Sequence, residues 1–221
     1  MTVRIAPSLL SADLGRLREQ AEAALAGGAE WLHVDVMDGR FVPNLTFGAP
    51  LLKALRKFTA APLDVHLMVQ EPERYIAEYA DLGATVFTFH PEATVHVQRH
   101  LAQIRKLGMQ AGLSLVPSSP LSLIEEVVGD IDLLLLMTVN PGFGGQSYIP
   151  ASTEKIRRAR ALLNARGSHA ALEVDGGITS ATIRDAWQAG ADTFVAGTAV
   201  FGEPDIGAAV RGLKLKCSER A

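Results

Sequence analysis

The chain has 221 residues, of which 48% are hydrophobic, and this is enough to bury a sizeable core. Its 21 Lys and Arg residues stand against 24 Asp and Glu residues, and the net charge of −3 excludes a broad positive surface for nucleic acid or anionic lipid. The single cysteine, Cys217, excludes an intramolecular disulfide. We therefore expect one domain over residues 1–221 that binds small molecules.

The N-terminal sequence does not predict a signal peptide or a membrane span. Val3 already begins a strand-like run, and no basic region followed by a long apolar stretch precedes it. We therefore expect a soluble, cytoplasmic protein that binds neither a membrane nor nucleic acid.

Eight short, apolar runs alternate with amphipathic segments along the chain, and each run is predicted to be a strand. The predicted strands cover residues 3–9, 31–36, 63–68, 85–90, 110–115, 133–137, 171–174 and 193–196. Between them, prolines suit the first turns of helices and glycines suit the residues just after helix ends. The prolines are Pro50, Pro72 and Pro120, and the glycines are Gly83, Gly108 and Gly190.

Eight successive βα units predict a closed (β/α)₈ TIM barrel. An open, doubly wound α/β sheet is the alternative, because it also alternates strands and helices. Two features favour the barrel. No G-x-G-x-x-G motif follows the first strand, and the charged or glycine-rich strand ends are spread over units two, three, six, seven and eight. A barrel brings all these ends to one face.

Two histidines and two aspartates lie at or near the ends of predicted strands two, three and seven. His33 and Asp35 are two residues apart, so both side chains point to the same face of their strand. Barrel closure would bring His66 and Asp175 to the same point. Two imidazoles and two carboxylates suit a borderline divalent ion, so the sequence predicts a site for zinc, with iron, cobalt or manganese as alternatives.

The remaining histidines and one further aspartate are interpreted differently. Asp64 shares the face of His66 but lies deeper in the strand, so we expect it to orient an imidazole. A lone histidine is more often a hydrogen-bonded core residue than a metal ligand. We expect this role for the four other histidines, His90, His96, His100 and His169.

Glycine-rich loops follow the last three predicted strands, at residues 139–146, 176–177 and 197–198. Each loop alone would be read as a turn that needs positive φ. Three of them in consecutive units predict a phosphate site, because the last loops of such barrels commonly bind phosphate through backbone N–H groups. These loops contain no Lys or Arg, so backbone dipoles would have to hold the anion.

The predicted metal site lies on one side of the barrel rim and the predicted phosphate site on the other. A sugar phosphate would span the gap between them. The ion would polarise an oxygen and stabilise the anion that forms when an adjacent proton leaves. If one aspartate removes a proton and the other returns one to the opposite face, the carbon is inverted. The residues therefore predict epimerisation next to a ketone.

Seven motifs resemble the ribulose-phosphate 3-epimerase family over residues 5–201. They are APSLLSAD at 6–13, HVDVMDG at 33–39 with VPN at 42–44, DVHLMV at 64–69, FHPEA at 89–93, NPGFGGQ at 140–146, VDGG at 174–177 and VAGTAVF at 195–201. The resemblance implies a TIM barrel of the ribulose-phosphate binding type with one divalent metal ion per chain. It also implies reversible conversion of D-ribulose 5-phosphate to D-xylulose 5-phosphate in the pentose phosphate pathway.

The resemblance also implies roles for individual residues. His33, Asp35, His66 and Asp175 would be the metal ligands, with Asp35 as proton acceptor and Asp175 as proton donor in one direction. The predicted substrate contacts are Ser8, Met37, His66, Met68, Met137, Gly142, Phe143, Gly144, Gly145, Gly176, Gly177, Gly197 and Thr198. The family associates, so a homo-oligomer is expected.

The chain departs from the family pattern at three places. Val116 begins the turn after strand five, where the family usually has an asparagine. Arg40 stands where histidine or asparagine is familiar, and Thr198 replaces a common serine but keeps the hydroxyl.

Two other functions remain open from the sequence alone. A sister epimerase for a six-carbon ketose phosphate would use the same metal and acids. A barrel that binds sugar phosphate or metal without turnover is disfavoured, because both aspartates are present.

Overall fold

The computed structural model describes residues 2–218 and shows eight parallel strands in a nearly closed barrel. The strands are β1 (Arg4–Pro7), β2 (Leu32–Met37), β3 (Leu63–Met68), β4 (Val86–Phe89), β5 (Gln110–Leu115), β6 (Leu133–Met137), β7 (Ala171–Asp175) and β8 (Thr193–Ala196). They pair in the order β1-β8-β7-β6-β5-β4-β3-β2. A parallel bridge between Ser8 and His33 brings the end of β1 to β2. The architecture is the predicted (β/α)₈ TIM barrel.

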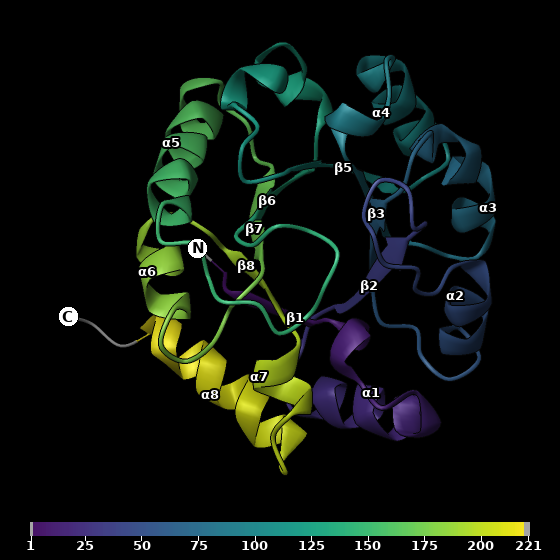
Figure 1. Ribbon diagram of the computed structural model, residues 1–221, viewed down its shortest axis with the longest axis vertical. Helices are drawn as coiled ribbons and strands as arrows, with labels where there is room; N and C mark the ends of the chain where they lie inside the picture. The colour runs from purple at the N-terminus through teal and green to yellow at the C-terminus, as the bar shows by residue number, and fades with distance from the viewer. Residues whose placement is uncertain (1, 219–221) are drawn as a thin grey trace.

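Helices form a layer around the strands (Figure 1). The α-helices are α1 (Leu17–Ala26), α2 (Ala49–Leu55), α3 (Ile76–Asp81), α4 (Val97–Lys106), α5 (Ser152–Ala165), α6 (Ile183–Gln188), α7 (Thr198–Phe201) and α8 (Ile206–Ser218). Short 3₁₀ helices are η1 (Leu9–Ser11), η2 (Leu14–Arg16), η3 (Pro72–Tyr75), η4 (Pro91–Ala93), η5 (Leu121–Leu123) and η6 (Glu125–Asp130). Over residues 2–218, none of the helices is long and apolar enough to cross a membrane.

The predicted strands all form, with bounds that agree to within two residues. Pro50 lies in the first turn of α2, and Pro72 begins η3. Pro120 is different, because it precedes only the 3₁₀ helix η5. The chain between β5 and β6 forms two 3₁₀ helices in place of an α-helix, and the β-branched pair Val127-Val128 followed by Gly129 disfavours a longer helix there.

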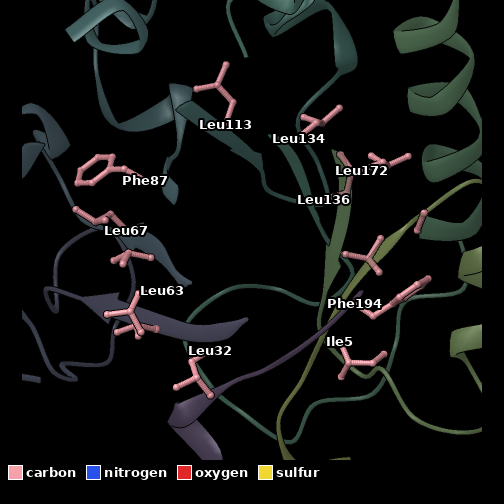
Figure 2. Packing of buried hydrophobic residues seen from close by; sticks show 14 of the residues in the cluster. Ile5, Leu32, Leu63, Leu67, Phe87, Leu113, Leu134, Leu136, Leu172 and Phe194 are labelled. Carbon is pink, nitrogen blue, oxygen red and sulfur yellow. The ribbon is translucent and has the colours of Figure 1, made fainter. Parts of the chain in front are cut away.

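Side chains alternate along each strand between the barrel interior and the helix layer. In β2, Val34 and Val36 belong to the large apolar cluster that also includes buried helix residues such as Leu52. Figure 2 shows other members of this cluster, including Leu136 and Phe194. Burying one such side chain contributes about 1.5–3 kcal/mol to folding. The alternate positions of the same strands therefore remain available for polar groups inside the barrel.

The cysteine lies on the last helix, α8. Cys217 is 1% exposed and is part of the apolar cluster between the helices and strands. Burial raises the pKa of its thiol to about 11. The side chain is therefore a small core residue in the folded protein.

Candidate functional site

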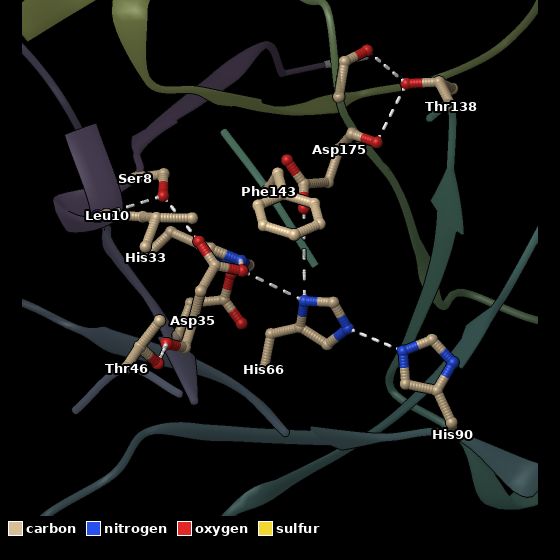
Figure 3. A network of polar contacts seen from close by, with 12 residues as sticks. Ser8, Leu10, His33, Asp35, Thr46, His66, His90, Thr138, Phe143 and Asp175 are labelled. Carbon is tan, nitrogen blue, oxygen red and sulfur yellow. Dashed lines mark hydrogen bonds and ion pairs between the residues drawn. The ribbon is translucent and has the colours of Figure 1, made fainter. Parts of the chain in front are cut away.

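Four side chains from three strands converge inside the barrel (Figure 3). His33 and Asp35 come from β2, His66 from β3 and Asp175 from the last position of β7. Each offers one potential ligand atom, and these four atoms lie within 4.8 Å of one another. The strand register explains part of this convergence, because Asp35 is paired directly with His66 across β2 and β3. The side chains are buried, with Asp175 the most exposed at 16%.

His33 presents its Nε2 atom to this cluster. Its Nδ1 atom lies 2.5 Å from Oδ2 of Asp64, and its Nε2 atom lies 3.2 Å from Oδ1 of Asp35. Asp64 therefore orients the ring of His33 from behind, as the sequence predicts.

His66 is turned the other way. Its Nδ1 atom lies 3.2 Å from Oδ1 of Asp35 and 4.0 Å from Oδ2 of Asp175. Its Nε2 atom lies 2.9 Å from Nε2 of His90. The sequence predicts His90 only as a core residue; the structure shows that it is buried and also contacts a predicted metal ligand.

The donor set fits a divalent metal ion. Nitrogen and oxygen ligands lie about 2.0–2.2 Å from zinc, so two ligands of a tetrahedral ion are about 3.3 Å apart. Both imidazole contacts with Asp35 are close to this separation. A second group of potential ligands, formed by His33, Asp64 and Glu173, is less suitable, because the contact of 2.5 Å between His33 and Asp64 is too short to have an ion between them. The cluster of His33, Asp35, His66 and Asp175 could therefore hold the metal.

The two aspartates of this cluster have opposite electrostatic environments. Burial opposes ionisation of Asp35, but the neighbouring His33 and His66 outweigh it and hold the pKa of this carboxyl far below its usual range. Burial, together with repulsion from Asp35, raises the pKa of Asp175 to about 7. Deeper in β7, burial and the neighbouring Asp64 raise the pKa of Glu173 well above its usual range. One carboxylate and one readily protonated carboxyl thus lie side by side.

A cavity of about 1490 Å³ opens beside the two aspartates. Asp35 and Asp175 line it, and so do these predicted substrate contacts: Ser8, Met37, Met68, Met137, Gly142, Phe143, Gly144, Gly145, Gly176, Gly177, Gly197 and Thr198. His66 is also a predicted substrate contact, but it is not one of the described residues that line this cavity. The imidazoles therefore lie behind the aspartates as seen from the cavity.

Close packing against neighbouring residues explains why glycine stands at two of the loop positions. Gly177 has a φ of +66°, and a Cβ atom there would lie 2.3 Å from the backbone nitrogen of Tyr148. A Cβ atom on Gly197 would lie 2.4 Å from Oγ of Ser11. The amide groups of Gly144, Gly145 and Gly177 donate no hydrogen bond to any other residue within 2–218. These loops thus offer unused N–H groups beside the cavity.

Several further residues that the sequence did not predict also line the cavity. Tyr148 follows the glycine-rich loop after β6, Thr182 and Asp185 lie at α6, and Lys216 adds a cationic side chain from α8. None of them stands at the end of a predicted strand. The other site residues were predicted from that position, so these residues carried no signal in the sequence.

Two of the histidine predictions are wrong. His100 is buried and lies within hydrogen-bond distance of Thr94. His96 and His169, however, are exposed. They lie in the connections directly before α4 and shortly before β7, where their side chains are in contact with solvent.

Solved structures with similar folds confirm the architecture. Orotidine 5′-phosphate decarboxylase from Pyrococcus horikoshii aligns with a TM-score of 0.70 at 14% identity and covers 98% of this chain and 100% of its own. Tryptophan synthase from Mycobacterium tuberculosis aligns with a TM-score of 0.70 at 16% identity and covers 98% of this chain and 93% of its own. At such low identity the likeness establishes the barrel fold alone.

Sequence comparison is more specific. The profile of the ribulose-phosphate 3 epimerase family matches residues 4–201. The ribulose-phosphate 3-epimerase of Escherichia coli strain K12 is 50% identical over 202 residues, which cover 91% of this chain and 90% of the relative. The enzyme of the same name from Synechocystis is 48% identical over 212 residues, with 95% and 92% covered. The chain belongs to the ribulose-phosphate 3-epimerase family.

Proposed function

We propose that this isomerase interconverts D-ribulose 5-phosphate and D-xylulose 5-phosphate by inverting C3, as a step of the pentose phosphate pathway. The observation that carries the proposal is the pair Asp35 and Asp175, which come from β2 and β7 and line one cavity. In the metal-free protein their pKa values are shifted in opposite directions. Two neighbouring carboxyl groups in such different environments suit a base and an acid. Membership of the family and the names of its relatives support the same activity.

The two carboxyl groups divide the proton transfers between them. In one direction, the carboxylate of Asp35 removes the proton from C3, which leaves a planar enediolate. The protonated carboxyl of Asp175 then delivers a proton to the opposite face of C3, and in the reverse direction the roles are exchanged. The hydroxyl of Ser8 donates a hydrogen bond of 2.5 Å to Oδ2 of Asp35 and thereby orients this carboxylate.

His33, Asp35, His66 and Asp175 would hold one divalent ion, with zinc as the first candidate and iron, cobalt or manganese as alternatives. When bound, the ion supplies positive charge next to the oxygen that becomes negative as the proton leaves. Asp64 and the barrel interior keep the rings in place and exclude water.

The phosphate of the substrate would bind at the opposite side of the cavity. The loops after β6, β7 and β8 offer amide groups that donate no hydrogen bond to any residue in the described part of the chain, such as those of Gly144, Gly145 and Gly177. Backbone N–H groups in such loops bind phosphate without a positively charged side chain. Anchoring the phosphate fixes the distance from this end of the substrate to C3.

The single domain over residues 1–221, the cytoplasmic location and the homo-oligomeric state belong to the same proposal. Light scattering on the purified protein would measure the oligomeric state. A monomer at all concentrations would contradict this part.

Solvent isotope exchange tests the proposed reaction directly. Purified, metal-loaded protein incubated with ribulose 5-phosphate in D₂O should place deuterium at C3 and form xylulose 5-phosphate. Nuclear magnetic resonance detects both results in one sample. If neither appears with metal present, the proposed reaction is wrong. A parallel assay with allulose 6-phosphate measures the preference for five-carbon over six-carbon substrates.

Amide variants test the two acids. Asp35→Asn and Asp175→Asn should each lower kcat by about 10²–10⁴-fold, because an amide cannot exchange the proton that the reaction needs. Far-ultraviolet circular dichroism and measurement of bound metal separate the loss of the acid from loss of the fold or the ion. A variant that turns over at the wild-type rate would remove that residue from the proposed mechanism.

A further inference from the structure

Behind His66, polar contacts continue away from the cavity into the β4 side of the barrel. His90 follows β4 directly, and its Nε2 atom lies 2.9 Å from Nε2 of His66. Its Nδ1 atom makes no hydrogen bond to another residue within 2–218 but lies at ion-pair distance, 3.5 Å, from Oε2 of Glu92. The other carboxylate oxygen of Glu92 accepts hydrogen bonds from the Ser119 hydroxyl at 2.5 Å and from the Val116 amide at 3.2 Å.

The order of these contacts fixes where each ring proton lies. A hydrogen bond between two ring nitrogens needs one N–H donor and one lone pair. His66 directs Nδ1 toward Asp35 and Asp175. With a metal ion bound at this cluster, the lone pair of His66 that holds the ion would be on Nδ1, and the ring proton would be on Nε2. Nε2 of His90 must then accept. In a neutral His90 ring the proton is therefore on Nδ1, the atom that faces the carboxylate of Glu92.

The surroundings hold His90 in this orientation and keep it away from the substrate. The residue is fully buried, and the ring of Phe41 packs against it with the ring centroids 4.7 Å apart. Neither His90 nor Glu92 is among the described residues that line the cavity. These two residues therefore act on the reaction indirectly, and the hydrogen-bond-length contact with His66 is their direct connection to a predicted metal ligand.

We propose that His90 and Glu92 are positioning residues for the metal site. They hold His66 as the Nε2–H tautomer and aim its Nδ1 lone pair at the ion. Asp64 has the same task for His33 from the other side, through the opposite ring nitrogen. The inference rests on the proposed function, because it requires a metal ion at the cluster of His33, Asp35, His66 and Asp175.

Glu92 also connects this arrangement to the loop after β5. The contacts with Val116 and Ser119 fix the carboxylate, and Lys155 donates to the carbonyls of Val116 and Pro117 in the same loop. The chain departs from its family pattern at Val116. The contact from this position uses the backbone amide, so it does not depend on the missing asparagine side chain.

Metal affinity is the main test. The dissociation constant for zinc is measured by competition with a coloured chelator in wild type, His90→Phe, His90→Gln and Glu92→Gln. His90→Phe should weaken zinc binding by about 10–100-fold, as for other residues that orient metal-bound histidines. His90→Gln should recover most of the affinity, because an amide offers an acceptor for His66 and a donor for Glu92. Glu92→Gln should weaken binding less than His90→Phe.

His100→Phe is the matched control. His100 is also buried and hydrogen-bonded, but it contacts Thr94 and no predicted ligand. This variant should bind zinc as tightly as wild type. The visible spectrum of the cobalt-substituted proteins gives a second readout, because it responds to ligand geometry. It should change in His90→Phe and remain unchanged in His100→Phe.

A measurement on the unaltered protein covers the case in which His90→Phe does not fold. Long-range ¹H–¹⁵N correlation spectra of the zinc-loaded wild type report which ring nitrogen of each histidine bears a proton. We expect a proton on Nε2 of His66 and on Nδ1 of His90, with Nε2 of His90 unprotonated. The opposite tautomer at either ring would overturn the proposal.

The outcomes separate this inference from the proposed metal site. If the wild type binds no zinc, cobalt, iron or manganese, the metal site itself is wrong. If the wild type binds zinc and His90→Phe binds it equally well with an unchanged cobalt spectrum, only the positioning role is wrong. Wild-type affinity in Glu92→Gln would limit that role to His90.

Discussion

Asp35 and Asp175 are chemically identical residues, and their neighbours make them different. Asp35 lies between two imidazoles and the hydroxyl of Ser8, all of which favour its ionised form. Asp175 lies at a greater distance from His66, at 4.0 Å, and next to the charge of Asp35. Two aspartates can therefore serve as a base and an acid because their surroundings differ.

The raised pKa of Asp175 predicts a pH effect on stability in the metal-free protein. In the unfolded chain this carboxyl ionises near its usual pKa of 3.8, whereas in the folded protein its pKa is about 7. The stability that it contributes is therefore present below about pH 4 and is lost as the pH rises through about 7. Asp35 contributes little change above about pH 5, because its carboxyl is then ionised both in the folded protein, where its pKa is far below the usual range, and in the unfolded chain.

Asp175→Asn removes this ionisation. The metal-free variant should be more stable than the metal-free wild type above about pH 7, and the difference should shrink toward pH 4 by at most about 1.4 kcal/mol per pH unit. Urea unfolding of both proteins over this pH range, with a chelator present, measures it. A difference that is constant with pH would show that Asp175 ionises normally.

At the scale of elements, the strands and the site follow from the same alternation. In β2, Val34 and Val36 pack against helices, and the alternate residues His33 and Asp35 face the interior. A period of two is visible in the sequence, which is why the strands and the four converging residues could be predicted. The contact between His66 and His90 could not be predicted, because it depends on ring orientations that spacing does not encode.

Loops and helices were less predictable for a related reason. The connection after β5 lacks an α-helix. Pro120 favours the start of a helix there, whereas the β-branched residues that follow disfavour its continuation. Tyr148 and Lys216 reach the cavity from outside the strand ends. Only the three-dimensional path of the chain brings such residues to the site.

The turn between β7 and α6 depends on Gly177. Gly177→Ala should cost several times more unfolding free energy than Gly108→Ala, although both glycines have positive φ. A Cβ atom at Gly108 meets no atom within 4 Å, so that substitution costs only the conformational strain of about 1–3 kcal/mol. At Gly177 the Cβ atom would also collide with the backbone of Tyr148. Urea unfolding measures both, and equal losses would contradict the close approach.

At the scale of the whole molecule, the barrel separates stability from chemistry. Apolar side chains fill the space between strands and helices, whereas the interior at one end of the barrel holds buried acids and imidazoles. Burying such groups without partners is costly, so this end of the barrel depends on mutual pairing and on a bound ion. The burial of the apolar cluster, which spans many of the strands and helices, stabilises the fold and offsets this free-energy cost.

Metal removal should therefore lower the stability of the whole barrel. An ion that binds only the folded state contributes about 2.7 kcal/mol when its concentration is 100 times the dissociation constant. Adding a chelator should lower the Tm, and returning zinc in excess should restore it. Differential scanning calorimetry measures both steps, with elemental analysis expected to find about one ion per chain. An unchanged Tm after verified loss of metal would contradict this expectation.

The buried thiol of Cys217 has a practical consequence for experiments on this barrel. A reagent that modifies thiols can reach this side chain only when α8 moves away from the strands and helices that cover it, and burial also keeps the sulfur in its unreactive protonated form. The chain has no competing cysteine. Where labelling is faster than reclosing, its rate therefore gives the rate at which the last turn of α8 opens in the native protein, without any engineered probe.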